Sequence, residues 1–126
     1  YRVAAEIAGQ LDENHYVVDF IALRDTLAAI VKELDHYMLL PTQHPRIVVR
    51  ANEREVEATF EDRRWVFPRG DCVLLEVPNT TAEMLARHIA GRLLAGLRER
   101  GIAEPETLRI EVDECYGQVG VYLWRR

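Results

Sequence analysis

Two adjacent polar residues near the end of an apolar repeat could work as an acid–base pair. Asp35 and His36 occur where that repeat stops, shortly before Pro41. A carboxylate that contacts an imidazole fixes its tautomer and stabilises its protonated form, which yields a general base near neutral pH. Neighbours on a helix point about 100° apart, so the pair could cooperate only where the helix ends. The alternative is structural: Asp35 is solvated, and His36 lies near the negative C-terminus of the helix, where protonated imidazole is favoured.

A carboxylate also closes an alternating segment near the end of the chain. Glu114 ends the run 109–114, on the side opposite Asp113 and Cys115. Such a carboxylate could accept two parallel N–H groups, the pair that a cyclic guanidine-like amide offers. An exposed glutamate at a strand end is the structural alternative.

A third group precedes the second amphipathic segment. Thr80 and Glu83 have the spacing of a capping box, and Thr81 then belongs to the first helical turn. Free backbone N–H groups at a helix N-terminus also attract anionic and amide-bearing ligands. Thr81 and Glu83 are therefore candidates for ligand binding as well as for helix capping.

The histidines and cysteines form no metal-binding motif. His15 and His44 lack a second ligand two or four residues away, and His88 has no histidine four residues along its helix. Cys72 and Cys115 match no Cys-x-x-Cys spacing and are expected to be small buried hydrophobes. The chain itself is predicted to hold no metal ion.

Hydrophobic periodicity places these candidates on a framework of strands and helices. One amphipathic helix is predicted from Asp19, its cap, to about Tyr37, and a second from Thr80 to Gly101. Strands are predicted, in chain order, at Tyr1 to Ile7, Arg46 to Ala51, Val56 to Phe67, Cys72 to Val77, Leu108 to Val112 and Val119 to Trp124. The second and third of these runs are interpreted as a hairpin. Two helices with one apolar stripe each suit one face of an antiparallel sheet, which predicts an α+β fold.

The composition is that of one globular domain. The chain has 126 residues, of which 48% are hydrophobic and 29% are charged, and no linker or repeat divides it. The net charge of −5, with scattered basic residues, argues against nucleic-acid binding. No apolar run reaches the ~18 residues that cross a membrane, and no leader opens the sequence, so a cytoplasmic protein is expected.

Four short motifs occur in a defined order along the chain. They are Val17-Val18-Asp19-Phe20, Leu34-Asp35-His36, Pro78-Asn79-Thr80-Thr81-Ala82-Glu83-Met84-Leu85-Ala86 and Glu111-Val112-Asp113-Glu114. In this order they resemble the 6-pyruvoyl-tetrahydropterin synthase and 6-carboxy-tetrahydropterin synthase family. The resemblance covers almost all of the chain except residues 42–77, which look like a β-rich insertion between the helices.

The resemblance implies the tunnelling fold. In that fold an antiparallel four-stranded sheet is backed by two long helices, three subunits close a barrel, and two trimers stack into a hexamer. The chain would then be a single pterin-synthase-like domain in a homo-oligomer, with an inserted β-hairpin. One strand of the sheet is expected to precede Tyr1.

The resemblance also implies roles for the candidate residues. Asp35 and His36 match the family's catalytic dyad. Glu114 matches its pterin anchor, and Thr81 with Glu83 match the helix-entry residues near the pterin. Zinc is the implied cofactor, and its three histidine ligands are expected upstream of Tyr1, together with the family's nucleophile-like Cys or Glu. The implied reaction converts 7,8-dihydroneopterin triphosphate to 6-carboxy- or 6-pyruvoyl-tetrahydropterin.

Two other functions stay open on the sequence alone. A folate-branch relative would cleave the dihydroneopterin side chain by an aldol step, and the residue that separates this reaction from the others is expected upstream. A pterin-binding or scaffolding relative would have lost both the metal and the chemistry. A composition rich in Arg and Ala favours the 6-carboxy product.

Overall fold

The structure contains two compact units. The computed structural model describes residues 1–126, and residues 1–33 together with 81–126 form one unit, here called the sheet–helix unit. Residues 34–80 form the other, here called the small unit. Each unit is described by itself.

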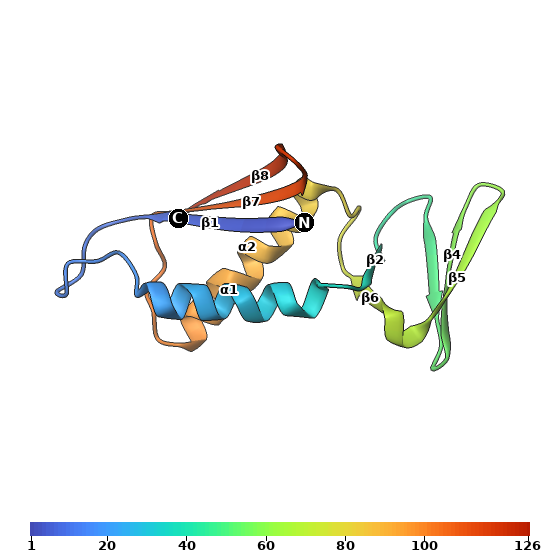
Figure 1. The fold of residues 1–126 in the computed structure, drawn as a ribbon, viewed down its shortest axis with the longest axis horizontal. Helices are drawn as coiled ribbons and strands as arrows, with labels where there is room; N and C mark the ends of the chain where they lie inside the picture. The colour runs from blue at the N-terminus through green and yellow to red at the C-terminus, as the bar shows by residue number, and fades with distance from the viewer. The chain divides into compact units, whose positions relative to one another are not determined.

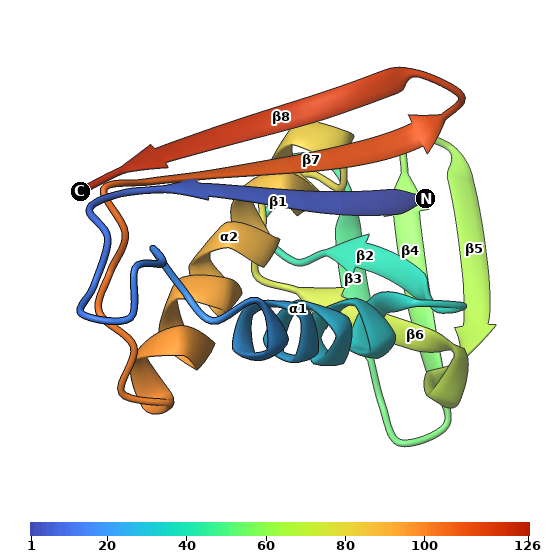
Figure 2. The ribbon, with the colours of Figure 1, turned by 60° about the vertical axis from the view of Figure 1, so that its left-hand side comes forward.

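The sheet–helix unit is a three-stranded antiparallel sheet with two helices on one face (Figure 1, Figure 2). Its strands are β1 (Arg2–Ala8), β7 (Thr107–Cys115) and β8 (Gln118–Arg125), with β7 in the centre. Its helices are α1 (Phe20–Leu34) and α2 (Ala82–Glu99). The predicted α+β class is confirmed, and this sheet has three strands in the chain where the family resemblance implies four.

Strand alternation builds the core of the sheet–helix unit. Leu108, Ile110 and Val112 of β7 are at most 1% exposed, and they face α2, which packs against β7 and β8. In the antiparallel register, Val3 and Ile7 of β1 lie opposite Val112 and Leu108. Burying such side chains stabilises a fold by roughly 1.5–3 kcal/mol each, before the entropy cost of ordering them. The predicted two-residue periodicity of both strands is confirmed.

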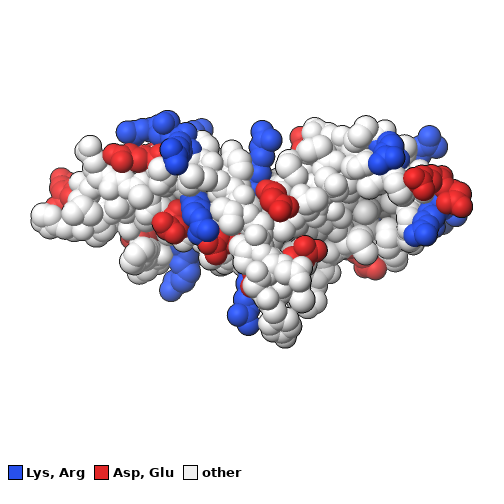
Figure 3. All heavy atoms as spheres, turned by 90° about the horizontal axis from the view of Figure 1, so that it is seen from above, with Lys and Arg blue, Asp and Glu red and all other residues white.

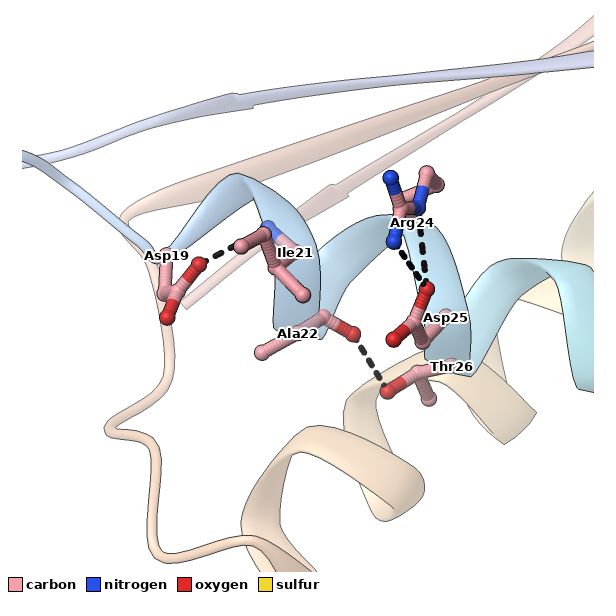
Figure 4. Close-up of polar contacts among 6 residues, drawn as sticks. All are labelled: Asp19, Ile21, Ala22, Arg24, Asp25 and Thr26. Atoms are coloured by element: carbon pink, nitrogen blue, oxygen red, sulfur yellow. Dashed lines mark hydrogen bonds and ion pairs between the residues drawn. The ribbon is translucent and has the colours of Figure 1, made fainter.

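Specific polar contacts fix the start and the packing of α1 (Figure 4). The Asp19 carboxylate accepts the Ile21 N–H at 2.7 Å, which confirms Asp19 as the helix cap. Thr26 is buried, but its hydroxyl donates to the Ala22 carbonyl at 2.7 Å, so this hydroxyl is satisfied. A Cβ on Gly96 of α2 would lie 2.6 Å from Cγ2 of Thr26, so glycine permits the close approach of the two helices.

The small unit has two short sheets around its own core. The first pairs β2 (Met38–Pro41) in parallel with β6 (Cys72–Leu75). The second is antiparallel in the order β3 (Val48–Ala51), β4 (Glu55–Phe60) and β5 (Arg63–Pro68), and a 3₁₀ turn, η1 (Arg69–Asp71), leads from β5 to β6. Four buried residues form the core, surrounded by three that are partly buried: Leu40, Val56, Ala58 and Cys72, then Val49, Phe67 and Leu74.

The structure corrects two predictions in this part of the chain. The helix ends at Leu34 rather than near Tyr37, because the backbone turns at His36, whose φ is 62°. The predicted hairpin is a three-stranded sheet, because the run 56–67 reverses at Glu61, whose φ is 53°. Strand β2, which the sequence pattern did not indicate, ends at Pro41 opposite Leu75.

Charges of both signs are mixed over the surface in the view of Figure 3. Lys and Arg side chains lie beside Asp and Glu side chains on that face rather than in a single basic stripe. Neither α1 nor α2 is long and apolar enough to cross a membrane.

Candidate active site

Asp35 and His36 contact each other directly beyond the end of α1. Nδ1 of His36 lies 3.0 Å from Oδ2 of Asp35, and the two side chains are 91% and 64% exposed. The left-handed backbone at His36 ends the helical geometry that would hold the neighbours apart. The pair therefore has the contact that a carboxylate needs to orient an imidazole, with the other ring nitrogen free for a substrate.

Glu114 occupies a β-bulge at the end of β7. Asp113 pairs with Val119 and Cys115 pairs with Gln118, so Glu114 has no partner in the β7–β8 ladder. Bulges of this kind re-aim a side chain and are frequent beside functional sites. Glu114 is exposed, and its Oε1 accepts a hydrogen bond from the Tyr1 hydroxyl at 3.3 Å. The carboxylate keeps free acceptor positions for a ligand.

Thr81, rather than Thr80, caps α2. Its hydroxyl oxygen accepts the Met84 N–H at 3.4 Å, and the helix begins at Ala82. The predicted capping box of Thr80 with Glu83 is wrong, because the helix starts one residue later and Glu83 becomes its second residue instead of its third. Glu83 is exposed in the first turn, beside the N–H groups of the helix terminus.

The start of α2 lies against the sheet close to the Glu114 end of β7. A Cβ on Gly120 of β8 would lie 2.6 Å from the Ala82 backbone carbon and from the Glu83 nitrogen. Gly120 is paired with Val112, two residues before Glu114. Figure 1 shows the first turn of α2 under the β7–β8 end of the sheet. Thr81, Glu83 and Glu114 therefore share one end of the sheet–helix unit, whereas Asp35 and His36 belong to the small unit.

A charged cluster holds the last turn of α1. Arg92 of α2 contacts both oxygens of Glu33, at 2.8 and 3.1 Å, and its hydrogen bond holds the pKa of the Glu33 carboxyl below the usual value. Nε2 of the nearby His88 is buried without a hydrogen-bond partner. Burial, followed by the charge of Arg92, lowers the pKa of His88, and Glu33 opposes that shift. The neutral form of the His88 imidazole is therefore favoured.

The side chains of this chain do not fit a zinc ion. No group of three or more His, Cys, Asp or Glu residues lies close enough together to hold a metal. Both cysteines are free thiols, and Cys115 is exposed rather than buried as predicted, since it lies beyond the bulge near the β7–β8 turn.

Tyr1 contacts the candidate residue Glu114, although the sequence pattern did not indicate this contact. Its place in the alternation of Tyr1, Val3, Ala5 and Ile7 assigns it to the inner face of β1, but only the pairing of β1 with β7 shows which residue it meets. The two-residue alternation along β1 was the only local pattern that indicated the face on which Tyr1 lies. The register of β1 against β7, two strands that are far apart in the sequence, is not encoded in either strand alone.

Comparison with solved structures defines the class of fold. A structure of 6-pyruvoyltetrahydropterin synthase from Plasmodium vivax superimposes with a TM-score of 0.87 at 22% identity, covering 98% of this chain and 78% of that chain. The enzyme from Plasmodium falciparum gives the same TM-score, identity and coverage. The chain has the fold of these synthases.

The sequence comparisons define the family. The family model described as 6-pyruvoyl tetrahydropterin synthase matches residues 1–123. The chain therefore belongs to the 6-pyruvoyl tetrahydropterin synthase family, as its motifs predict.

Two relatives carry a more specific name. A protein of Methanocaldococcus jannaschii named "Putative 6-carboxy-5,6,7,8-tetrahydropterin synthase" is 28% identical over 123 residues, which are 97% of this chain and 76% of the relative. A protein of Pyrococcus abyssi with the same name is 32% identical over 99 residues, or 79% of this chain and 58% of the relative.

Proposed function

We propose that the protein converts 7,8-dihydroneopterin triphosphate to 6-carboxy-tetrahydropterin, as a carbon–oxygen lyase of the 6-pyruvoyl-tetrahydropterin synthase type. Membership of the family supports pterin conversion, and the names of the archaeal relatives favour the 6-carboxy product over 6-pyruvoyl-tetrahydropterin. The observation that carries the proposal is the bulged Glu114, which shares one end of the sheet with the start of α2.

Glu114 is proposed to anchor the pterin ring. A pterin presents two adjacent N–H groups, and one carboxylate can accept both in a charge-assisted pair. Thr81 and Glu83 lie at the N-terminus of α2, where backbone N–H groups and a further carboxylate can contact the polar edge of the same ring. These three residues hold and orient the substrate in the proposal.

Asp35 and His36 are proposed to move protons on the substrate side chain. The 3.0 Å contact lets Asp35 orient the ring and stabilise imidazolium when His36 takes up a proton. The exposure of His36 in this chain leaves its ring open to a substrate. General acid–base catalysis of this kind contributes about 10²–10⁴-fold to a rate.

Zinc and subunit association complete the proposal. Because no residues of Tyr1–Arg126 fit the metal, we propose that zinc is held by ligands outside this segment. We also propose that the protein is cytoplasmic and that it forms a homo-oligomer, a trimer or hexamer. The outer strands of the β1-β7-β8 sheet carry unpaired backbone groups, which supports the proposed association. Sedimentation at micromolar concentration tests the association, and a stable monomer would contradict it.

Product analysis tests the proposed reaction. The zinc-loaded protein is incubated with 7,8-dihydroneopterin triphosphate, and the products are separated and identified by mass spectrometry. The proposal predicts 6-carboxy-tetrahydropterin. Accumulation of 6-pyruvoyl-tetrahydropterin, or the product of an aldol cleavage, would contradict that choice. Binding of pterin without turnover would identify a pterin-binding or scaffolding relative instead.

A further inference from the structure

Tyr1 and Glu114 meet because the sheet places them opposite each other. Arg2 pairs with Asp113 and Val3 with Val112, and the same antiparallel register extended by one residue sets Tyr1 opposite Glu114. Residues directly opposite in an antiparallel pair project from the same face. The hydroxyl of Tyr1 donates to Oε1 of Glu114 at 3.3 Å, which is a cross-strand contact between residues 113 positions apart.

Because Glu114 lies in a bulge, its contact with Tyr1 can decide which way the carboxylate points. Glu114 has no partner in the β7–β8 ladder, and its neighbours pair with Val119 and Gln118. An exposed glutamate has several rotamers of similar energy, and a ligand that needs one of them must first select it. A hydroxyl bonded to one carboxylate oxygen restricts that choice, and each of the two oxygens still has a free lone pair to accept an N–H group.

The Tyr1 phenol keeps the proton that it donates to Glu114. Partial burial, the charge of Glu114 and the hydrogen bond to it, in that order, raise the pKa of the Tyr1 phenol above its usual value. The phenol therefore keeps its proton throughout the neutral range, and its partner is the acceptor.

We propose that Tyr1 is a positioning residue, which orients the Glu114 carboxylate toward the two N–H groups of a bound pterin. The inference rests on the proposed role of Glu114 as the pterin anchor. Tyr1 itself need not touch the ligand. A tyrosine at this place would raise affinity by organising the carboxylate before the pterin arrives.

A double-mutant cycle tests the inference with sepiapterin as the probe. Tyr1→Phe removes only the hydroxyl and should weaken binding about threefold to tenfold, the effect of one hydrogen bond. In a Glu114→Gln background the same change should have little further effect, because the two residues act together. Tyr116→Phe is the matched control, since Tyr116 is 99% exposed and two residues from Glu114. Urea unfolding of every variant separates a loss of affinity from a loss of stability.

A second ligand sharpens the test. Lumazine carries an oxygen in place of the 2-amino group of a pterin and cannot offer the same pair of N–H donors to a carboxylate. A positioning role predicts that Tyr1→Phe reduces sepiapterin affinity and leaves the weaker lumazine affinity unchanged. Equal losses for both ligands, equal effects of Tyr1→Phe and Tyr116→Phe, or additivity with Glu114→Gln would overturn the inference.

The binding measurements distinguish a failure of Glu114 as the pterin anchor from a failure of Tyr1 as its positioning residue. If Glu114→Gln binds sepiapterin normally, Glu114 is not the anchor and the inference falls with it. If Glu114→Gln loses affinity while Tyr1→Phe does not, the anchor stands and the positioning role of Tyr1 is wrong.

Discussion

Glu114 and the Asp35–His36 pair differ in what fixes their geometry. Glu114 lies near the end of β7, whose inner residues Leu108, Ile110 and Val112 are fully buried, and a bulge and a cross-strand tyrosine set its position. Asp35 and His36 lie just beyond a helix, in a unit with a small core, and they are mostly exposed.

The two candidate carboxylates, Glu114 and Asp35, are therefore placed in two different ways. Long-range pairing places Glu114, so its position depends on the packing of the sheet–helix unit. A local backbone turn places Asp35 against His36. The contact between these two side chains therefore depends on the φ angle of His36. Changes to packing should therefore affect the first group most, and changes at the turn should affect only the second.

Core truncations give the largest expected effect and separate the two units. Leu93→Ala should lower the free energy of unfolding by about 2–5 kcal/mol, toward the upper end because Leu93 is fully buried. Leu40→Ala, in the small core, should cost less and act on the small unit. Trp124 lies in the sheet–helix unit and Trp65 in the small unit, so Trp65→Phe and Trp124→Phe backgrounds give one fluorescence signal for each unit during urea unfolding. Equal shifts of both signals by Leu40→Ala would show that the units unfold as one.

Changing the dyad should reduce turnover without affecting pterin affinity. We expect His36→Ala to lower kcat on dihydroneopterin triphosphate by ~10²-fold or more, Asp35→Asn to be milder, and the double variant to be little worse than His36→Ala. Steady-state kinetics of the zinc-loaded protein, with its zinc content checked, measure this. Near-normal turnover of His36→Ala would return His36 to the role of a helix-terminus residue.

Two controls separate the imidazole from the backbone turn. His36→Gly suits a φ of 62° and should keep or raise stability while losing as much activity as His36→Ala. His15→Ala removes another histidine with a positive φ, 67°, and should leave turnover unchanged. Activity in His36→Gly would contradict a role for the ring.

Gly120→Ala tests the packing that brings α2 to the Glu114 end of the sheet. The new Cβ would meet the Ala82 and Glu83 backbone at 2.6 Å, so the helix start must shift, at a cost of about 1–3 kcal/mol. Sepiapterin affinity should fall with it. Gly91→Ala, which meets nothing within 4 Å, is the control and should be neutral or stabilising. Unchanged stability and affinity in Gly120→Ala would contradict this account.

His88 gives the smallest expected effect, on the pH dependence of stability. Burial lowers the pKa of folded His88 below its ordinary 6.5, so the unfolded chain binds a proton more readily. The contribution of His88 to the free energy of unfolding is therefore full above the pKa of the unfolded chain. It is lost as the pH falls through the lower pKa of the folded protein. His88→Gln should flatten this part of a plot of unfolding free energy against pH. An unchanged plot would show that His88 is not responsible.

The sequence predicts much of the fold for physical reasons. The two-residue alternation of Leu108, Ile110 and Val112 and the cap at Asp19 are local signals, and the structure confirms both. The three-stranded sheet in residues 48–68 was missed because a turn at Glu61, a residue that seldom adopts positive φ, interrupts a continuous β-rich run. The parallel pairing of β2 with β6 joins segments too far apart for a local pattern to reveal.

The candidate site was predictable only in part. The adjacency of Asp35 and His36 along the chain indicated their contact, because a helix terminus frees neighbouring side chains to meet. The bulge at Glu114 and the contact with Tyr1 depend on the register of three strands, which no single segment specifies. The cap of α2 was displaced by one residue because Thr80 and Thr81 have the same capping chemistry.

Sepiapterin titration of Glu114→Gln tests the central claim most directly, since it removes the charge of the proposed anchor and keeps its size. We expect a loss of affinity of more than tenfold, because a charge-assisted pair worth roughly 1.5–3 kcal/mol is lost, and we expect the free energy of unfolding to stay unchanged. Glu111→Gln, three residues earlier on the same strand, should bind normally. Unchanged affinity in Glu114→Gln would contradict the account and leave Glu114 an exposed residue at the end of a strand.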